Sequence, residues 1–140
     1  MFKIRKLTDT ISPSNKGAIN QVFDILRAHF PTVKEEKINA VLEQMKNPKK
    51  YQFSSHIFVA ENGKNDVRGF AILFYMPDMH FCFLDYIAVV PGKTSSGVGG
   101  AIYERIREEA QLLNTIGIFM ECLPDDENLC KDKSEINQNK

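Results

Sequence analysis

Apolar residues in the first third of the chain recur at the spacing of amphipathic helices. Two stripes advance mainly in steps of three and four residues, as the core-facing side of a helix does. The stripes consist of Ile19, Val22, Phe23, Leu26 and Phe30, and of Ile38, Val41, Leu42 and Met45. Pro31 ends the first helix, and Asn47 and Pro48 end the second, which we predict over residues 33–46. Residues 2–6 alternate apolar and basic side chains, which predicts an edge or half-buried strand.

The middle of the chain changes to strand-like patterns separated by turn residues. Residues 56–61 and 67–76 flank an Asn-Gly pair, which is a strong hairpin signal. A Pro-Asp turn follows, and residues 81–90 return, so these segments predict an antiparallel meander. Because residues 81–90 are apolar on both faces, we place that strand at the centre of the sheet. Gly69, inside the second strand, predicts a bulge or a close contact.

A loop rich in glycine and hydroxyl residues (91–100) joins the last of these strands to an amphipathic helix over residues 101–113. Residues 117–122 then form a further strand. Because a helix connects the strands 81–90 and 117–122, we expect them to be parallel, with a right-handed crossover. The sequence therefore predicts an α/β (α+β) fold with a mixed sheet.

The loop before this helix has the residue types of a phosphate site. The first N–H groups of a helix have no partners inside the helix, and the macrodipole gives them partial positive charge. The loop offers glycines that leave the backbone open, one positive charge, and hydroxyls that can cap the helix or donate hydrogen bonds. These residues are Gly97, Gly99, Gly100, Lys93, Ser95 and Ser96. An ordinary strand-to-helix connection with a serine cap explains the loop equally well.

Residues 84–106 resemble the signature of the GCN5-related N-acetyltransferases, the GNAT superfamily. The stretch LDYIAVVP (84–91) is similar to the end of the family's fourth strand. The family signature, Gln or Arg, two residues, Gly, one residue, then Gly or Ala, corresponds to residues 94–99. Thr94 stands where the family usually has Gln or Arg, and Lys93 is the neighbouring basic residue. This departure affects one expected contact to a pyrophosphate.

The resemblance implies a GNAT-like sheet with helices on both faces, and acetyl-CoA as co-substrate without a metal. It also implies that the fourth and fifth strands splay apart and that the pantetheine arm lies between them, paired with backbone groups near residues 87–89. Polarisation of the thioester carbonyl needs only a hydrogen-bond donor, and a backbone N–H within residues 88–90 suffices. The coenzyme-binding candidates are Ile87, Ala88, Val89, Val90, Lys93, Thr94, Ser95, Ser96, Gly97, Val98, Gly99, Gly100 and Ala101. The implied reaction transfers acetyl directly to a primary amine of a small molecule or a protein.

Such a transfer needs a base, because a protonated amine has no lone pair. Asp85 and Glu121 are the candidates, since each interrupts an apolar strand where desolvation raises a carboxyl pKa. An exposed carboxylate or a structural ion pair is the alternative for each. Glu121 is favoured because it lies nearer the C-terminal end of its strand. Tyr86 and Tyr103 are expected to be packing residues.

Composition narrows the class of protein. With 140 residues we expect one domain, residues 1–140. The net charge of zero implies no general attraction to nucleic acid or membranes. The three cysteines form no CxxC motif, which favours a reduced, cytoplasmic protein, and the three histidines are too scattered for a zinc site.

The last residues, 124–140, are polar and are not expected to build a core element, so the core is placed at about residues 1–123. The family's next helix and two further strands have no counterpart here, which predicts a C-terminally incomplete fold. The fifth strand then has an open edge that invites a homodimer.

Two other functions fit parts of the sequence. A degenerate acyl-CoA-binding or interaction module without turnover would account for Thr94 and the missing elements. A dinucleotide-binding oxidoreductase would account for Gly97-Val98-Gly99, but Ile102 stands at the third glycine position, and the antiparallel meander argues against that fold.

Overall fold

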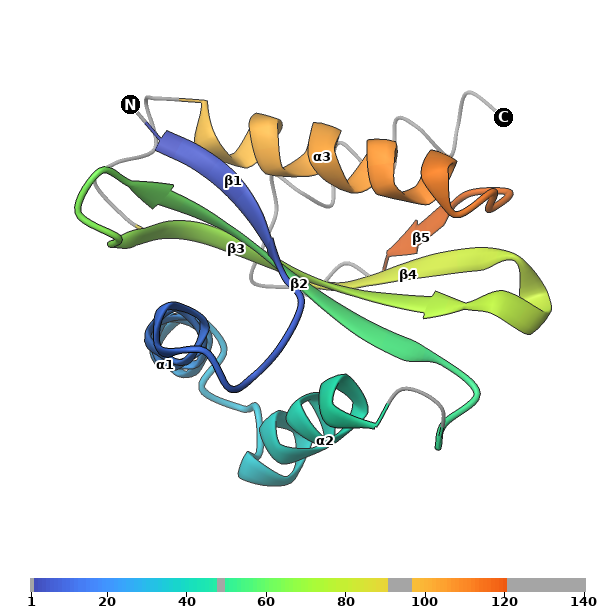
Figure 1. The fold of residues 1–140 in the computed structure, drawn as a ribbon, viewed down its shortest axis with the longest axis horizontal. Coiled ribbons are helices and arrows are strands. Elements are labelled where there is room, and N and C mark those ends of the chain that lie inside the picture. The colour runs from blue at the N-terminus through green and yellow to red at the C-terminus, as the bar shows by residue number, and fades with distance from the viewer. Residues whose placement is uncertain (1, 48–49, 91–96, 121–140) are drawn as a thin grey trace.

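The computed structural model describes residues 2–47, 50–90 and 97–120. Within these ranges the chain forms one five-stranded sheet with helices on both faces: α3 covers one face, and α1 and α2 cover the other (Figure 1). The elements in chain order are β1 (Phe2–Leu7), α1 (Pro13–His29), α2 (Glu35–Lys46), β2 (Ser54–Asn62), β3 (Val67–Met76), a 3-10 turn (Pro77–Met79), β4 (Phe81–Val89), α3 (Val98–Leu112) and β5 (Ile118–Met120). The predicted mixed sheet with two helix layers is confirmed.

The strands are ordered β1-β2-β3-β4-β5 in space. The pairs β1–β2, β2–β3 and β3–β4 are antiparallel, and the pair β4–β5 is parallel, as the sequence predicted. The central strand is β3 rather than β4, so that expectation was wrong by one position. The apolar residues of β4 are explained by the helices instead. Residues of β4 pack on one face of the sheet under α3 and on the other face under α1 and α2.

The largest difference in element bounds lies at the start of α3. This helix begins at Val98, whereas we predicted a loop up to Gly100. Gly97 takes the N-cap position in the left-handed conformation, with φ of 77°, which a residue with a side chain adopts at a cost. Gly97 has no side chain with which to cap the helix, and the predicted serine caps, Ser95 and Ser96, lie outside the described residues.

Gly69 sets how closely α3 lies on the sheet. A Cβ atom at this position would stand 2.9 Å from Cδ1 of Ile102, 3.0 Å from Cγ1 of Val98 and 3.1 Å from the carbonyl oxygen of Ala88. The same strand region also carries a register shift against Ala60 and Glu61. Both parts of the prediction for Gly69, a close contact and a bulge, are thus found.

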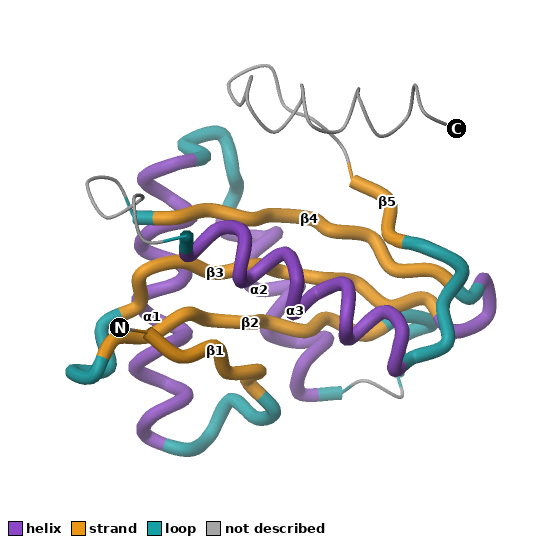
Figure 2. Tube along the Cα trace, turned by 90° about the horizontal axis from the view of Figure 1, so that it is seen from above, coloured by secondary structure: helices purple, strands orange, loops and turns teal. Residues whose placement is uncertain are grey.

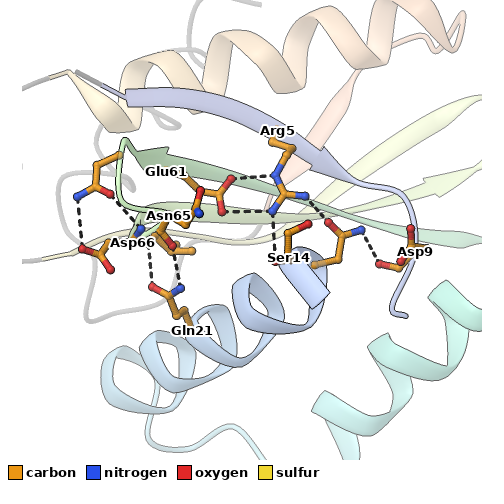
Figure 3. Close-up of polar contacts among 10 residues, drawn as sticks. Arg5, Asp9, Ser14, Gln21, Glu61, Asn65 and Asp66 are labelled. Carbon is orange, nitrogen blue, oxygen red and sulfur yellow. Dashed lines mark hydrogen bonds and ion pairs between the residues drawn. The ribbon is translucent and has the colours of Figure 1, made fainter. Parts of the chain in front are cut away.

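A polar cluster ties α1 to the first strands and to the β2–β3 turn (Figure 3). Arg5 donates to both carboxylate oxygens of Glu61, at 2.8 and 3.2 Å, and also bonds Asn15 of α1. Gln21 donates to the carbonyl of Asn65 at 3.1 Å and accepts from the N–H of Val67 at 2.8 Å. These bonds fix the first helix against the sheet.

A second charged cluster joins β1 to α3 on the opposite face. The carboxylate of Glu109 is buried, 2.6 Å from Nζ of Lys6 and 3.0 Å from Nη1 of Arg105. Burial alone favours the neutral acid, but the hydrogen bonds and charges of Lys6 and Arg105 outweigh it and lower the pKa of Glu109. Burial, followed by the positive charge of Lys6, lowers the pKa of His56 to about 4, against a partly opposing effect of Glu109.

Candidate active site

The first turn of α3 forms one end of the candidate site. Gly97 precedes it, and the N–H of Ala101 donates to the carbonyl of Gly97 at 3.1 Å, which leaves the N–H groups before it free of intrahelical partners. A Cβ at Gly100 would meet nothing within 4 Å, and one at Gly99 would lie 3.4 Å from Cγ2 of Val89. This turn therefore offers open backbone next to the end of β4. Lys93, Thr94, Ser95 and Ser96, predicted for the same site, lie outside the described residues.

The part of β4 beyond its described pairs with β5, which we call the fork, forms the middle of the candidate site. The parallel pairs are Cys82 with Ile118, Phe83 with Phe119 and Leu84 with Met120, whereas β4 continues to Val89. Figure 2 shows β5 beside only one end of β4. Within the described residues, the stretch 85–89 of β4 therefore has no partner strand on the side away from β3.

The hydrogen bond of Val90 indicates which backbone groups face this open side. Its N–H donates to the carbonyl of Arg68 at 2.8 Å, so it points toward β3. Successive residues of an antiparallel ladder alternate in direction, which turns the backbone groups of Ala88 toward β3 and those of Ile87 and Val89 toward the fork. Among residues 88–90, the expected donors for the thioester carbonyl, Val89 is the one that faces the fork.

A bulge in β4 places two polar side chains together at the base of the fork. Leu73 pairs with Leu84 and Ile72 pairs with Tyr86, which leaves Asp85 as the extra residue. Leu84 packs in the core under α3, whereas Tyr86 packs in the core under α1 and α2. Asp85 reaches α2 as well, so the bulge turns two consecutive side chains to one face.

Asp85 is mostly buried, with 14% of its side chain exposed, and its Oδ2 lies 2.9 Å from Nζ of Lys37. The same Nζ stands 4.7 Å from the ring centroid of Phe74, which is a cation–π arrangement. The sequence left open whether Asp85 is a base or part of an ion pair, and an ion pair is present. Nothing in the sequence pattern pointed to Lys37, because a basic residue beside a helix stripe is ordinarily a solvated one.

Tyr86 and Tyr103 pack against the two cores, as predicted. The ring of Tyr86 meets the ring of Phe30 edge-on, with centroids 5.0 Å apart. Burial, followed by the negative charge of Asp85, raises the pKa of Tyr86, which keeps its phenol protonated. Glu121, the favoured base, lies outside the described residues.

The described residues contain no group of three or more His, Cys, Asp and Glu side chains that could hold a metal ion. Among the helices in the same ranges, none combines the length and apolar character needed to cross a membrane.

Solved structures with a similar fold include Tetrahymena GCN5, with a TM-score of 0.78 at 15% identity over 93% of this chain and 76% of that one. A ribosomal-protein-alanine N-acetyltransferase from Brucella melitensis biovar Abortus 2308 gives a TM-score of 0.70 at 13% identity, over 97% and 90% of the two chains. An aminoglycoside acetyltransferase from an uncultured soil metagenomic sample, in complex with sisomicin, gives 0.68 at 15% identity, over 96% and 86%. These identities establish a shared fold only.

No curated protein matches the sequence. A family model does: residues 19–131 match the Acetyltransferase (GNAT) family. This match includes α2, the meander, the fork and the glycine-rich start of α3, which are the parts that form the candidate site. The chain therefore belongs to the GNAT acetyltransferase family.

Proposed function

We propose that this chain transfers the acetyl group of acetyl-CoA to the primary amine of a small molecule or a protein. The observation that carries the proposal is the β4–β5 fork, which leads from the open first turn of α3 to the Asp85 bulge. An extended ligand with phosphates at one end and a reactive group at the other fits this path. Family membership supports acyl-CoA as that ligand.

In the proposed complex, the N–H groups of residues 98–100 hold phosphate oxygens, as helix N-termini do. The outward backbone groups of Ile87 and Val89 pair with the two amides of the pantetheine arm in the manner of an added strand. The predicted contacts of Lys93, Thr94, Ser95 and Ser96 to the pyrophosphate remain part of this proposal.

For the chemical step, Asp85 takes the proton of the acceptor ammonium, and the amine nitrogen attacks the thioester carbon. The new C–N bond forms, the C–S bond breaks, and the sulfur leaves and is protonated to the thiol. On this path the outward N–H nearest Asp85 is that of Ile87, and it donates to the thioester carbonyl oxygen as negative charge develops on it, which moves this role from the expected residues 88–90. Glu121 stays the second candidate for the base.

Titration calorimetry with CoA and acetyl-CoA, with NAD as the control ligand, tests the coenzyme site. Gly100→Glu adds a negative charge at the first turn of α3 without a clash, since a Cβ there meets open space. We expect CoA affinity to fall about tenfold or more, which corresponds to about 1.4 kcal/mol. Gly17→Glu, at an equally open helical glycine in α1, is the matched control and should leave the affinity unchanged. Equal affinities of both variants and the parent would refute the site.

The ion pair between Lys37 and Asp85 favours a second candidate function. If that pair persists in the complex, the carboxylate is neutralised and the chain binds acyl-CoA without turnover. Release of free thiol from acetyl-CoA in the presence of a panel of primary amines separates the two functions. Binding without thiol release for any amine in the panel would favour the binding module.

Two further parts of the proposal concern assembly and location. The outer edge of β5 has no partner strand within the described residues, and the exposed Phe119 lies on this strand, so we propose pairing of two chains there. Sedimentation of the chain and of Phe119→Lys tests this, with a dimer expected only for the parent.

Cys82, a free and buried thiol, supports a reducing, cytoplasmic environment.

A further inference from the structure

The two contacts of Lys37 have the chemistry that recognises an alkylammonium group. Its Nζ lies 2.9 Å from Oδ2 of Asp85 and 4.7 Å from the ring centroid of Phe74. A carboxylate and an aromatic face are the two groups that recognise a protonated primary amine in a partly desolvated setting. The Lys37 side chain is 37% exposed, so it reaches these partners from the surface of α2 and can leave them.

The Lys37–Asp85 ion pair lies next to the last described pair of β4 with β5. Leu84 with Met120 is the last parallel pair, and Asp85 is the next residue of β4. A ligand whose phosphates sit at Gly97–Gly100 and whose arm follows Ile87 and Val89 has its far end directed at Asp85. From Ile87 to Asp85 the strand advances only about 7 Å. The thioester end of acetyl-CoA and the amine of Lys37 therefore converge on the same carboxylate.

We propose that Lys37 is itself an acetyl acceptor, so that each chain acetylates its own α2. This inference rests on the coenzyme site proposed above. The ammonium of Lys37 gives one proton to Asp85, and its nitrogen attacks the thioester carbon. A C–N bond forms, the C–S bond breaks, and CoA leaves as the thiol after the sulfur takes up a proton. The products are an acetamide on Lys37 and free CoA.

The modification changes the site electrostatically. An acetylated Lys37 is neutral, so it no longer pairs as a cation with Asp85 or with the face of Phe74. Self-acetylation would thus remove the positive charge that Lys37 places beside the carboxylate of Asp85.

Another lysine of the same region offers a chemically matched comparison. Nζ of Lys50 lies 3.9 Å from Oε1 of Glu43 and 5.8 Å from the ring centroid of Tyr51, so it too has a carboxylate and an aromatic ring. Neither partner belongs to β4, and Lys50 has no fork beside it. If the environment of the amine alone determined reactivity, the two lysines would be modified alike.

The experiment incubates the full chain with acetyl-CoA and measures acetylation of each lysine by peptide mass mapping over time. We expect Lys37 to be modified about tenfold or more faster than Lys50, since it is held near the thioester at high effective concentration. The rate per chain should not change when the protein is diluted at constant, saturating acetyl-CoA. Lys37→Arg should remove the main acetylated site and keep CoA binding, and Asp85→Asn should slow modification of Lys37 while CoA still binds.

Acetyl phosphate, as a purely chemical acetyl donor, gives the reference pattern. Preference for Lys37 only with acetyl-CoA supports the inference. CoA binding in calorimetry together with equal modification of Lys37 and Lys50 would overturn it and leave the acetyltransferase proposal standing. A rate per chain that rises with protein concentration would overturn self-modification within one chain. Absence of CoA binding would overturn both proposals.

Discussion

Lowering the pH from 7.5 to 5 is expected to destabilise the fold through His56. Its pKa is about 4 in the folded chain, against 6.5 for an unperturbed histidine, because burial and then the nearby charge of Lys6 oppose its protonation. The unfolded chain therefore takes up a proton first, and the folding equilibrium shifts toward it as the pH falls below about 6.5. The loss continues down to about pH 4, where the folded chain takes up the same proton.

The two pKa values set the size of the effect. At pH 5 the unfolded chain is almost fully protonated at this site and the folded chain is mostly neutral, which gives a loss of about 2 kcal/mol in the free energy of unfolding. The full shift, if completed at lower pH, corresponds to about 3 kcal/mol. Such a loss is a large part of the stability of a small domain.

Urea denaturation at pH 7.5, 6.5, 5.5 and 5 measures this free energy. His56→Gln removes the titrating ring, so its stability should fall less than that of the parent by about 2 kcal/mol over this range. His29→Gln, at an exposed histidine of α1, is the control and should follow the parent. Parallel curves for the parent and His56→Gln would refute the reasoning, because carboxylates titrate alike in both.

Three other changes test the structure more directly. Gly69→Ala should destabilise the fold by about 1–3 kcal/mol and weaken CoA binding, because its methyl group pushes Val98 and Ile102 of α3 off the sheet; urea denaturation and calorimetry measure this, and an unchanged stability contradicts the close contact. Glu109→Gln should lower the free energy of unfolding by about 3 kcal/mol, because Lys6 and Arg105 lose a buried charge partner; a neutral effect at pH 7 would contradict their role. Asp85→Asn should reduce the acetyl transfer rate by about 10²–10⁴-fold with unchanged CoA affinity. Full activity would mean that Asp85 is not the base, which leaves Glu121 as the remaining candidate.

The elements were predictable where a single periodicity continued without interruption. The stripe from Ile19 to Phe30, and the apolar segment 67–76 after the Asn-Gly hairpin signal, were enough to locate α1 and β3. The start of α3 was not, because glycines have low helix propensity and the helix begins only through the left-handed turn at Gly97. The local sequence pattern therefore predicted helix α3 but not the position of its first turn.

The sequence named the coenzyme loop and Asp85 for the candidate site, but not the partner of Asp85. The residues near Gly97 are contiguous, and their resemblance to a family motif could be seen directly. The ion pair of Lys37 with Asp85 joins α2 to β4, which are far apart in the sequence. It depends on the β4 bulge, which residue propensities do not predict. The hydrogen bond from the Val90 N–H to the carbonyl of Arg68 likewise depends on how β4 is aligned with β3, and this alignment is set only in the folded sheet.

The bulge at Asp85 also bears on how the chain tolerates the loss of a residue. Leu84, Tyr86 and Ile87 face alternate sides of the sheet, as in a regular strand, if Asp85 is left out of the count. A chain from which Asp85 is deleted can therefore keep every neighbouring apolar side chain in its own core. Most single-residue deletions in a strand invert the facing of all that follows. Asp85 is an extra residue between two regular strand pairs, so a carboxylate can be added or removed at this position while the neighbouring residues keep their facing.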